Sequence, residues 1–383
     1  MSSVSPAEVA SFGAAPFGTV FSALRDAVAQ DLRPIVQDID ARGVYPRAFM
    51  ERMGALGGFA QGVPAQYGGA GRGVQHTVQL MEEVARECLS TGFCVWCQTV
   101  CAWYIQNSGS ERLKSEFLPK IADGRMIAGT GMSNPMKHFA DIEKIRLTAR
   151  RTPGGYQISG ALPWVSNAVP EGCFAFVAQI AGEPGEYLMA ITPPGAPGLT
   201  LGDGGHFIAL EGSSTHNAIF KDMFLPDDFV LAAPCREYVT AIRPGFVLTQ
   251  AGFGLGLVAS CIDLMRRANE RVGHVNRYLD DGAGEIEADL QEARGRTYAL
   301  AEQIGCGEHT LGPEATREAI ACRILASELA LRASQAAMLH TGAAGYRSGA
   351  AAERKLRESY FVAIVTPALK HLKKLQHDLG ALN

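Results

Sequence analysis

The 383-residue chain lacks the features that mark binding to charged surfaces. Its 35 Lys and Arg residues are balanced by 39 Asp and Glu residues, the net charge is −4, and no basic run is present. A protein that binds nucleic acid or an anionic membrane surface needs such a run, so neither partner is expected. The first residues, 1–6, lack the basic segment and following apolar segment of a secretory signal. We therefore expect a soluble, cytoplasmic protein.

The sequence also lacks the spacings of a disulfide scaffold, a metal site or a hydrolase triad. Nine cysteines, an odd number, indicate free thiols in a reducing compartment. Cys94, Cys97 and Cys101 share a helix face, but apolar neighbours surround them and no histidine or second cysteine pair accompanies them, which favours small buried side chains over metal ligands. The histidines are scattered, and no Gly-x-Ser-x-Gly elbow stands out. No metal is expected.

The hydrophobic pattern divides the chain into three parts. Apolar residues recur at helical spacing up to about residue 125, although Pro34 should kink or split the stretch 22–39. Short apolar runs bounded by Gly, Pro and Asn then predict five or more antiparallel strands. These runs are 145–148, 156–159, 173–180, 187–191 and 217–224. Long helical stretches return at 291–305, 313–343 and 350–380.

The predicted fold class is therefore α+β. The expected domains are an N-terminal α-helical domain (1–125), a middle antiparallel β-domain (126–234) and a C-terminal helical bundle (235–383). The apolar stretch 246–265 approaches membrane-span length, but Gln250 and Asp263 interrupt it, which favours a buried bundle helix. The Gly-Phe-Gly-Leu-Gly sequence at 252–256 lies inside this helical pattern with no strand before it, so a nucleotide-binding glycine loop is not expected there.

The run 154–168 is the most informative stretch of the chain. It begins with a Gly-Gly turn and ends on Trp164, Val165, Ser166 and Asn167. Side chains alternate along a strand with period 2, which predicts that Trp164 and Ser166 point the same way. A planar redox ring could then pack on the indole while the Ser166 hydroxyl reaches the ring edge. An ordinary hairpin with a core tryptophan remains the alternative.

Several segments, in the same order, resemble the acyl-CoA dehydrogenase superfamily of flavoproteins. The Trp-Val-Ser-Asn segment is similar to that family's Trp-Ile-Thr-Asn. Other similar segments are Pro-Ala-Gln-Tyr-Gly-Gly-Ala-Gly at 64–71, the helix and lead-in at 109–124, the strand region at 212–228, Gly-Ala-Ala-Gly-Tyr at 342–346 and Glu-Arg-Lys-Leu-Arg-Glu at 353–358. The family fold consists of a helical domain, a β-domain and a four-helix bundle, which agrees with the pattern above.

The resemblance implies that FAD lies between the β-domain and the C-terminal bundle. Met132 and Ser133 would contact the pyrimidine side of the flavin ring, with Val165 in the adjoining motif. Trp164 would pack on the ring and Ser166 would donate a hydrogen bond near N5. Arg271 would match an FAD-contacting arginine, and Gly342 and Ala343 would approach the cofactor of a partner chain, which implies a homodimer or homotetramer. Donors at the ring edge stabilise the negative charge of a reduced flavin.

The sequence departs from the family where a catalytic base is expected. The glutamate that removes the α-proton of the acyl thioester corresponds to Thr366, counted from Arg357, and a threonine hydroxyl is too weak a base for this task. The region around Arg243, where some relatives carry an alternative glutamate, has no carboxylate either. The family's glycine-rich segment after Pro135 is replaced by Met-Lys-His-Phe at 136–139. The catalytic residue is therefore unknown.

Three functions remain open. The first is an FAD-dependent oxidoreductase of acyl-CoA dehydrogenase type with a relocated base or a different substrate, which would use acyl-CoA or a related molecule and an electron-transfer flavoprotein. The second is a flavin monooxygenase that receives reduced flavin from a separate flavin reductase. The third is a non-catalytic subunit that pairs with an active relative. Resemblance over nearly the whole chain favours the first.

Overall fold

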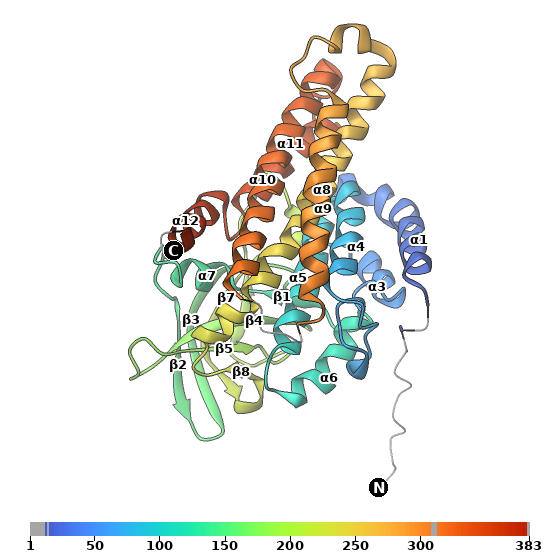
Figure 1. Cartoon of the computed structure of the whole chain (residues 1–383). Coiled ribbons are helices and arrows are strands. Elements are labelled where there is room, and N and C mark those ends of the chain that lie inside the picture. Colours follow the sequence, from blue (N-terminus) through green and yellow to red (C-terminus); the bar gives the residue numbers. More distant parts are fainter. Residues whose placement is uncertain (1–11, 14, 308–311, 381–383) are drawn as a thin grey trace.

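The computed structural model describes residues 12–13, 15–307 and 312–380. Helices come first, strands follow, and a bundle of long helices ends the chain (Figure 1). Figure 1 shows the sheet at the lower left, the N-terminal helices at the right and the C-terminal helices rising above both. This arrangement confirms the predicted α+β fold class, whereas the exact domain boundaries stay a prediction.

The N-terminal part consists of helices whose bounds follow the hydrophobic periodicity. They are α1 (Phe17–Ala27), α2 (Val36–Arg42), α3 (Arg47–Ala55), α4 (Val74–Glu87), α5 (Leu89–Gln106) and α6 (Glu111–Ala122). A π-helical turn and a 3-10 turn containing Pro34 separate α1 from α2, which confirms the predicted split. Ser110 caps α6, because its hydroxyl accepts a hydrogen bond from the backbone N–H of Leu113.

An eight-stranded sheet forms the middle part. Its strands are β1 (Ala128–Thr130), β2 (Leu147–Thr152), β3 (Gly155–Val165), β4 (Cys173–Ile180), β5 (Tyr187–Ile191), β6 (Leu199–Gly202), β7 (His216–Pro226) and β8 (Val230–Ala232). They are ordered β6-β7-β3-β2-β4-β5-β8, with β1 paired to β4. The sheet is mixed, because β4 pairs in parallel with both β1 and β2, so the expectation of a purely antiparallel domain was wrong.

The short helix α7 (Ser133–His138) includes most of the segment 136–139, which replaces the expected glycine-rich run. Its buried Asn134 donates hydrogen bonds to a carboxylate oxygen of Glu143 (3.1 Å) and to the carbonyl of Lys144 (2.9 Å). The Oδ1 atom of Asn134 accepts from the backbone N–H of Arg146 (3.1 Å). These contacts with a later segment hold α7 in place, and they are not visible in its local sequence.

The C-terminal part comprises α8 (Arg236–Asn276), α9 (Ala283–Ile304), α10 (Pro313–Thr341), α11 (Ala351–Ile364) and α12 (Leu369–Gly380). The stretch 350–380, expected to be one helix, is two, because Pro367 lies in the turn between α11 and α12 and lacks the N–H that would continue the helical ladder. Only α8 among the described helices is long and apolar enough to span a membrane, but 94% of its apolar window is buried in the protein. It packs against α4 and α10 as the predicted core helix.

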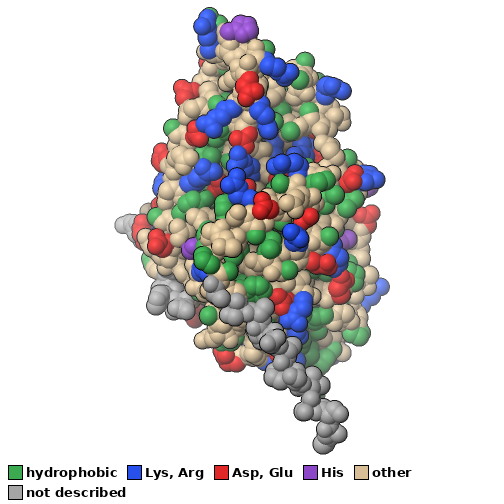
Figure 2. Space-filling view, turned by 90° about the vertical axis from the view of Figure 1, so that its right-hand side faces the viewer, with side chains coloured by type: hydrophobic (Ala, Val, Ile, Leu, Met, Phe, Trp, Pro, Cys, Tyr) green, Lys and Arg blue, Asp and Glu red, His purple; other side chains and the backbone are tan. Residues whose placement is uncertain are grey.

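The core is continuous through the three parts. The cysteines at 94, 97 and 101 are buried in α5, which confirms their assignment as small buried side chains. Within the described residues no group of His, Cys, Asp and Glu could hold a metal ion. On the outside, charged side chains of both signs are mixed over the face shown in Figure 2, and lysine and arginine gather in its upper half.

Candidate functional site

A cavity of about 440 Å³ lies between the end of β3, the start of α7, the end of α11 and the segment 207–215. Four of the residues assigned to the flavin from the sequence line it together: Met132, Ser133, Trp164 and Ser166. Thr366, at the position expected for the base, lines the same cavity. The structure therefore brings together residues that are up to 234 positions apart in the chain.

Trp164 presents its indole to the cavity through a strained backbone. Its φ angle is 62°, in the left-handed region that bulky residues rarely adopt, and the pairing of β3 with β7 shifts register between Leu162 and Val165. Trp164 and Ser166 do line one cavity, as predicted. The predicted cause, regular alternation of side chains along a strand, was wrong, because the strand is irregular at this point. The Trp164 side chain is 47% exposed, and its ring centroid is 5.6 Å from that of Phe207. A core tryptophan is thus ruled out.

Ser166 belongs to a chain of hydroxyl groups. Thr215 donates a hydrogen bond to Ser166 Oγ (2.9 Å), and Thr215 Oγ1 is in turn 2.8 Å from Ser213 Oγ. The backbone of Ser166 forms a bridge with Thr130. Because Ser166 accepts from Thr215, its own hydroxyl proton remains available for an acceptor in the cavity.

Thr366 and Ser133 form a hydroxyl pair on another wall, with their oxygen atoms 2.9 Å apart. The carbonyl of Thr366 accepts a hydrogen bond from Gln250 Nε2 (2.9 Å). Gln250 is held by Arg323, whose Nε donates to Gln250 Oε1 (3.0 Å) and whose guanidinium also donates to the carbonyl of Val362 near the end of α11. These bonds fix the turn that carries Thr366.

Arg323 was not found from the sequence. It is fully buried, and burial lowers the pKa of its guanidinium to about 9. Its hydrogen-bond acceptors within the described residues are neutral oxygens of Gln250, Ser327 and Val362, with no carboxylate among them. The only hint in the sequence was a charged Arg323 at an otherwise apolar position of the helical pattern. It places a positive charge behind the turn that contains Thr366.

The cavity wall carries no carboxylate and no imidazole among its described residues, and its charged members are Lys137 and Arg357. The Lys137 ammonium forms an ion pair with Glu143, at 2.9 Å from a carboxylate oxygen. Hydrogen bonds with Asp40 and Glu353 raise the pKa of Arg357. The described lining therefore offers no carboxylate for α-proton removal, and the identity of the base stays a prediction.

Arg357 also holds the segment that covers the cavity. Its Nη1 donates to the carbonyl of Ile208 (2.6 Å), and its Nη2 donates to Asp40 Oδ2 (2.6 Å) in α2. Its Nε donates to Glu353 on the same helix, so this one guanidinium joins α11 to α2 and to the segment around Ile208. This arrangement closes one side of the cavity with the segment that includes Phe207 and Ile208.

The remaining predicted cofactor residues do not join this cavity. Val165 is fully buried, and Arg271, Gly342 and Ala343 are exposed. The helix ends beside these exposed residues are joined, since Asn276 at the end of α8 donates to the carbonyl of His340 near the end of α10 (3.1 Å). Their role toward a partner chain stays a prediction.

His371 in α12 is 3% exposed, and its Nδ1 has no hydrogen-bond partner among the described residues. Burial, and then the nearby charges of Arg243, Lys374 and Lys137, lower the pKa of His371 to about 4. The imidazole is therefore neutral in the folded protein at neutral pH. His371 does not line the cavity, so we expect its protonation to change the stability of the fold and not the binding of a ligand there.

The stability should accordingly fall in mild acid. The unfolded chain binds a proton at His371 near pH 6.5, whereas the folded chain resists protonation until about pH 4. This difference costs on the order of 2 kcal/mol of unfolding free energy as the pH falls across that window. His371→Gln should remove this part of the slope in urea titrations, and the exposed His377→Gln control should retain it. Equal slopes in both variants would contradict the assignment.

The cavity fits a planar redox ring. A half-exposed indole offers a flat face, Ser166 offers a free donor, and Phe93, Trp96, Phe246 and Phe361 supply apolar walls. Flat apolar walls with few fixed donors are typical of cofactor cavities. The residues that line the cavity therefore suit the flavin ring implied by the sequence.

Comparisons with known proteins agree with this geometry. The model of the acyl-CoA dehydrogenase N-terminal domain matches residues 19–125. Human mitochondrial short-chain specific acyl-CoA dehydrogenase is 26% identical over 364 residues, which cover 89% of this chain and 84% of the human protein. Among solved structures, Megasphaera elsdenii butyryl-CoA dehydrogenase superposes with a TM-score of 0.84 at 18% identity and covers 100% of both chains.

A structure with a different activity has nearly the same fold. Dibenzothiophene monooxygenase from Paenibacillus sp. A11-2 superposes with a TM-score of 0.81 at 16% identity, covering 94% of this chain and 96% of that one. The fold alone therefore does not distinguish dehydrogenation from oxygenation. The sequence relatives and the matched N-terminal model support membership of this chain in the acyl-CoA dehydrogenase superfamily, and the whole-chain superposition shows the same fold.

Proposed function

We propose that the protein is an FAD-dependent oxidoreductase of acyl-CoA dehydrogenase type that oxidises a small acyl thioester or a related substrate without a glutamate base. The observation that carries this proposal is the single cavity in which Met132, Ser133, Trp164 and Ser166 meet Thr366. The relatives named above act on acyl-CoA substrates, and the same substrate class is proposed here. Arg271, Gly342 and Ala343 would complete the FAD site of a second copy.

The flavin supplies the acceptor for a hydride from the substrate. Trp164 would pack against one face of the ring and keep it against the apolar wall. Ser166 would donate its free hydroxyl proton to the ring edge, where negative charge develops. Ser133 and Thr366 would orient the substrate through their hydroxyl pair. Phe207 and Ile208, held by Arg357, would exclude water from that side.

The absence of a lining carboxylate restricts the substrate. A thioester α-proton of ordinary acidity requires a base matched to it, and neither a threonine hydroxyl nor a lysine that is ion-paired with a glutamate matches the family's free carboxylate. We therefore propose a substrate whose proton is already acidic, or one that loses its proton to water or to its own functional group. An unactivated straight-chain acyl-CoA should react slowly.

The test is anaerobic flavin reduction after reconstitution with FAD and gel filtration. We expect the protein to retain FAD and butyryl-CoA to bleach its visible bands slowly. Thr366→Glu places a carboxylate on the cavity wall and should speed this bleaching at least about tenfold, within the usual range for a positioned base. Thr366→Gln, of similar size but without a base, is the matched control. Equal rates in both variants would contradict base loss as the cause, and failure to retain FAD would contradict the proposed function.

A flavin monooxygenase is the second candidate, favoured by the same lack of a lining carboxylate. Such an enzyme needs no base for α-proton removal and receives its flavin reduced. After gel filtration such a protein would retain no oxidised FAD and would be colourless, but it would bind reduced flavin tightly. Comparing the dissociation constants of oxidised and reduced FAD for one preparation therefore discriminates between the candidates: tighter binding of the oxidised form supports the dehydrogenase.

A further inference from the structure

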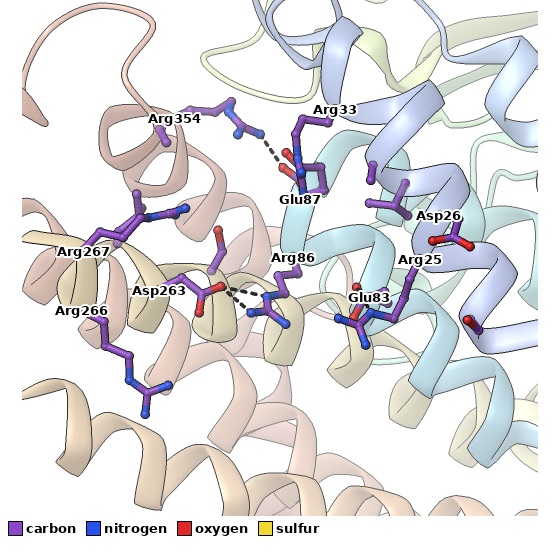
Figure 3. Close-up of a pocket in the computed structure, with 16 residues that line it drawn as sticks. Arg25, Asp26, Arg33, Glu83, Arg86, Glu87, Asp263, Arg266, Arg267 and Arg354 are labelled. Atoms are coloured by element: carbon purple, nitrogen blue, oxygen red, sulfur yellow. Dashed lines mark hydrogen bonds and ion pairs between the residues drawn. The ribbon is translucent and has the colours of Figure 1, made fainter. Parts of the chain in front are cut away.

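A second, larger cleft of about 940 Å³ lies away from the flavin cavity, and the two share no lining residue. Its walls come from α1 and the π-helical turn after it, from the end of α4, from the middle of α8 and from the start of α11 (Figure 3). A volume of this size admits a nucleotide-sized molecule. The proposed function assigns it no role.

The cleft is rich in arginine. Its lining contains six arginines and four carboxylates, so it carries an excess of two positive charges. The arginines are Arg25, Arg33, Arg86, Arg266, Arg267 and Arg354; the carboxylates are Asp26, Glu83, Glu87 and Asp263. The cleft opens on a protein whose net charge is −4, so this local excess is opposite in sign to the whole chain.

Most of the arginines are already paired. Arg25 is 3.4 Å from Glu83, Arg33 is 2.9 Å from Glu87, and Arg86 is 2.6 Å from Asp263. Arg266 pairs with Glu287 of α9, which is not among the lining residues. In Figure 3 the Arg266 side chain points away from the other labelled residues, and Asp26 stands on the opposite wall, on α1. Two arginines remain.

Of these two, Arg267 has no ion-pair partner among the described residues, whereas Arg354 pairs with Glu358 of α11 and has one donor, Nε, left over. Arg354 is 6% exposed; its Nη1 donates to the carbonyl of Glu87 (3.0 Å) and to Glu358 Oε1 (3.3 Å), but its Nε has no hydrogen-bond partner in the part of the chain that the structure describes. Arg267 is exposed and forms no ion pair or hydrogen bond with any residue of the described ranges. Figure 3 shows both side chains extending toward α4, one from α8 and one from α11.

We propose that this cleft binds a phosphorylated small molecule through Arg267 and Arg354. The planar guanidinium fork matches the oxygens of a phosphoryl group, and such charge-assisted bonds are strong where solvent is partly excluded. Arg354 supplies the desolvated donor, and Arg267 supplies an exposed one beside it. Ion pairs hold the other four arginines, so the ligand is met by the unpaired charge of Arg267 and the free Nε of Arg354.

The test uses the flavin-loaded protein and inorganic pyrophosphate as the probe. We expect saturable binding in isothermal titration calorimetry, and we expect Arg267→Gln to weaken it at least about tenfold, as loss of a charge-assisted pair requires. Arg266→Gln is the matched control, because it removes the neighbouring charge, which points away from the cleft; its affinity should stay within twofold of wild type. Flavin absorbance is recorded throughout, so the result does not depend on the proposed redox activity.

Three outcomes would overturn the proposal. They are no saturable binding to the wild-type protein, equal affinity in Arg267→Gln, or the same loss in Arg266→Gln, which would indicate a diffuse charge effect. A change of sedimentation in Arg267→Gln with unchanged pyrophosphate affinity would instead assign the cleft to a contact between copies, and would also overturn it. Equal melting temperatures of the three proteins are required before affinities are compared.

Discussion

Replacing Trp164 by alanine is expected to weaken FAD binding by about tenfold to a hundredfold. Stacking of an aromatic heterocycle on an indole contributes roughly 1–3 kcal/mol, and alanine removes it. The side chain is 47% exposed, so its loss should change the flavin affinity much more than the stability of the fold. Fluorescence titration of the apoprotein with FAD measures the effect.

The controls separate stacking from general damage. Trp164→Phe retains a flat ring and should keep most of the affinity. Phe224→Ala removes a side chain of similar exposure on β7 that does not line the cavity, and it should leave FAD binding unchanged. Wild-type affinity in Trp164→Ala would place the flavin ring elsewhere. Ser166→Ala should retain the ring but shift its absorption bands, because the donor at the ring edge is lost.

Much of the fold could be predicted because its elements carry local patterns. The buried strands β4 and β5 are apolar runs between turn residues, and the prediction placed both at their observed bounds. Strands β1, β6 and β8 have only three or four residues, too few for any period to be visible. The break between α11 and α12 had a visible signal in Pro367, and treating the stretch as one helix was an error of interpretation.

Only those parts of the site that lie within recognisable sequence motifs could be predicted. The motif around Trp164 was enough to locate the cavity. The left-handed backbone conformation that exposes the indole accompanies a register shift against β7, a strand about 50 residues later in the chain, and the motif does not show it. Arg323 reaches the Thr366 turn through Gln250, over 73 and 116 positions. Hydrogen bonds over such separations leave no periodicity in a single sequence. They are set by tertiary packing, and the structure is needed to find them.

A second large effect is expected from a cluster that fixes α11 against α4 and α5. Glu358 is 1% exposed; its Oε2 is 2.9 Å from the ammonium of the fully buried Lys355, and its Oε1 is 3.3 Å from Arg354 Nη1. Oε1 also accepts from the backbone N–H of Leu89 (3.3 Å), and Lys355 donates to the carbonyl of Ala85 (3.2 Å). One carboxylate therefore compensates two cations that water does not reach. Proximity to Glu358 raises the pKa of Arg354 against the opposing effect of burial.

Glu358→Gln should therefore lower the free energy of unfolding by about 3–5 kcal/mol, because it leaves two buried cations without a counter-charge. Urea denaturation followed by circular dichroism measures the loss. Asp378→Asn, which breaks the exposed Lys374–Asp378 pair in α12, is the matched control and should cost under about 1 kcal/mol. Replacing Lys355 and Glu358 together by Met and Leu should cost less than Glu358→Gln alone, since the buried charge that needs compensation is then reduced. If Glu358→Gln and Asp378→Asn unfolded at the same urea concentration, the cluster would hold α11 by packing alone, and the stabilising role of its charges would be refuted.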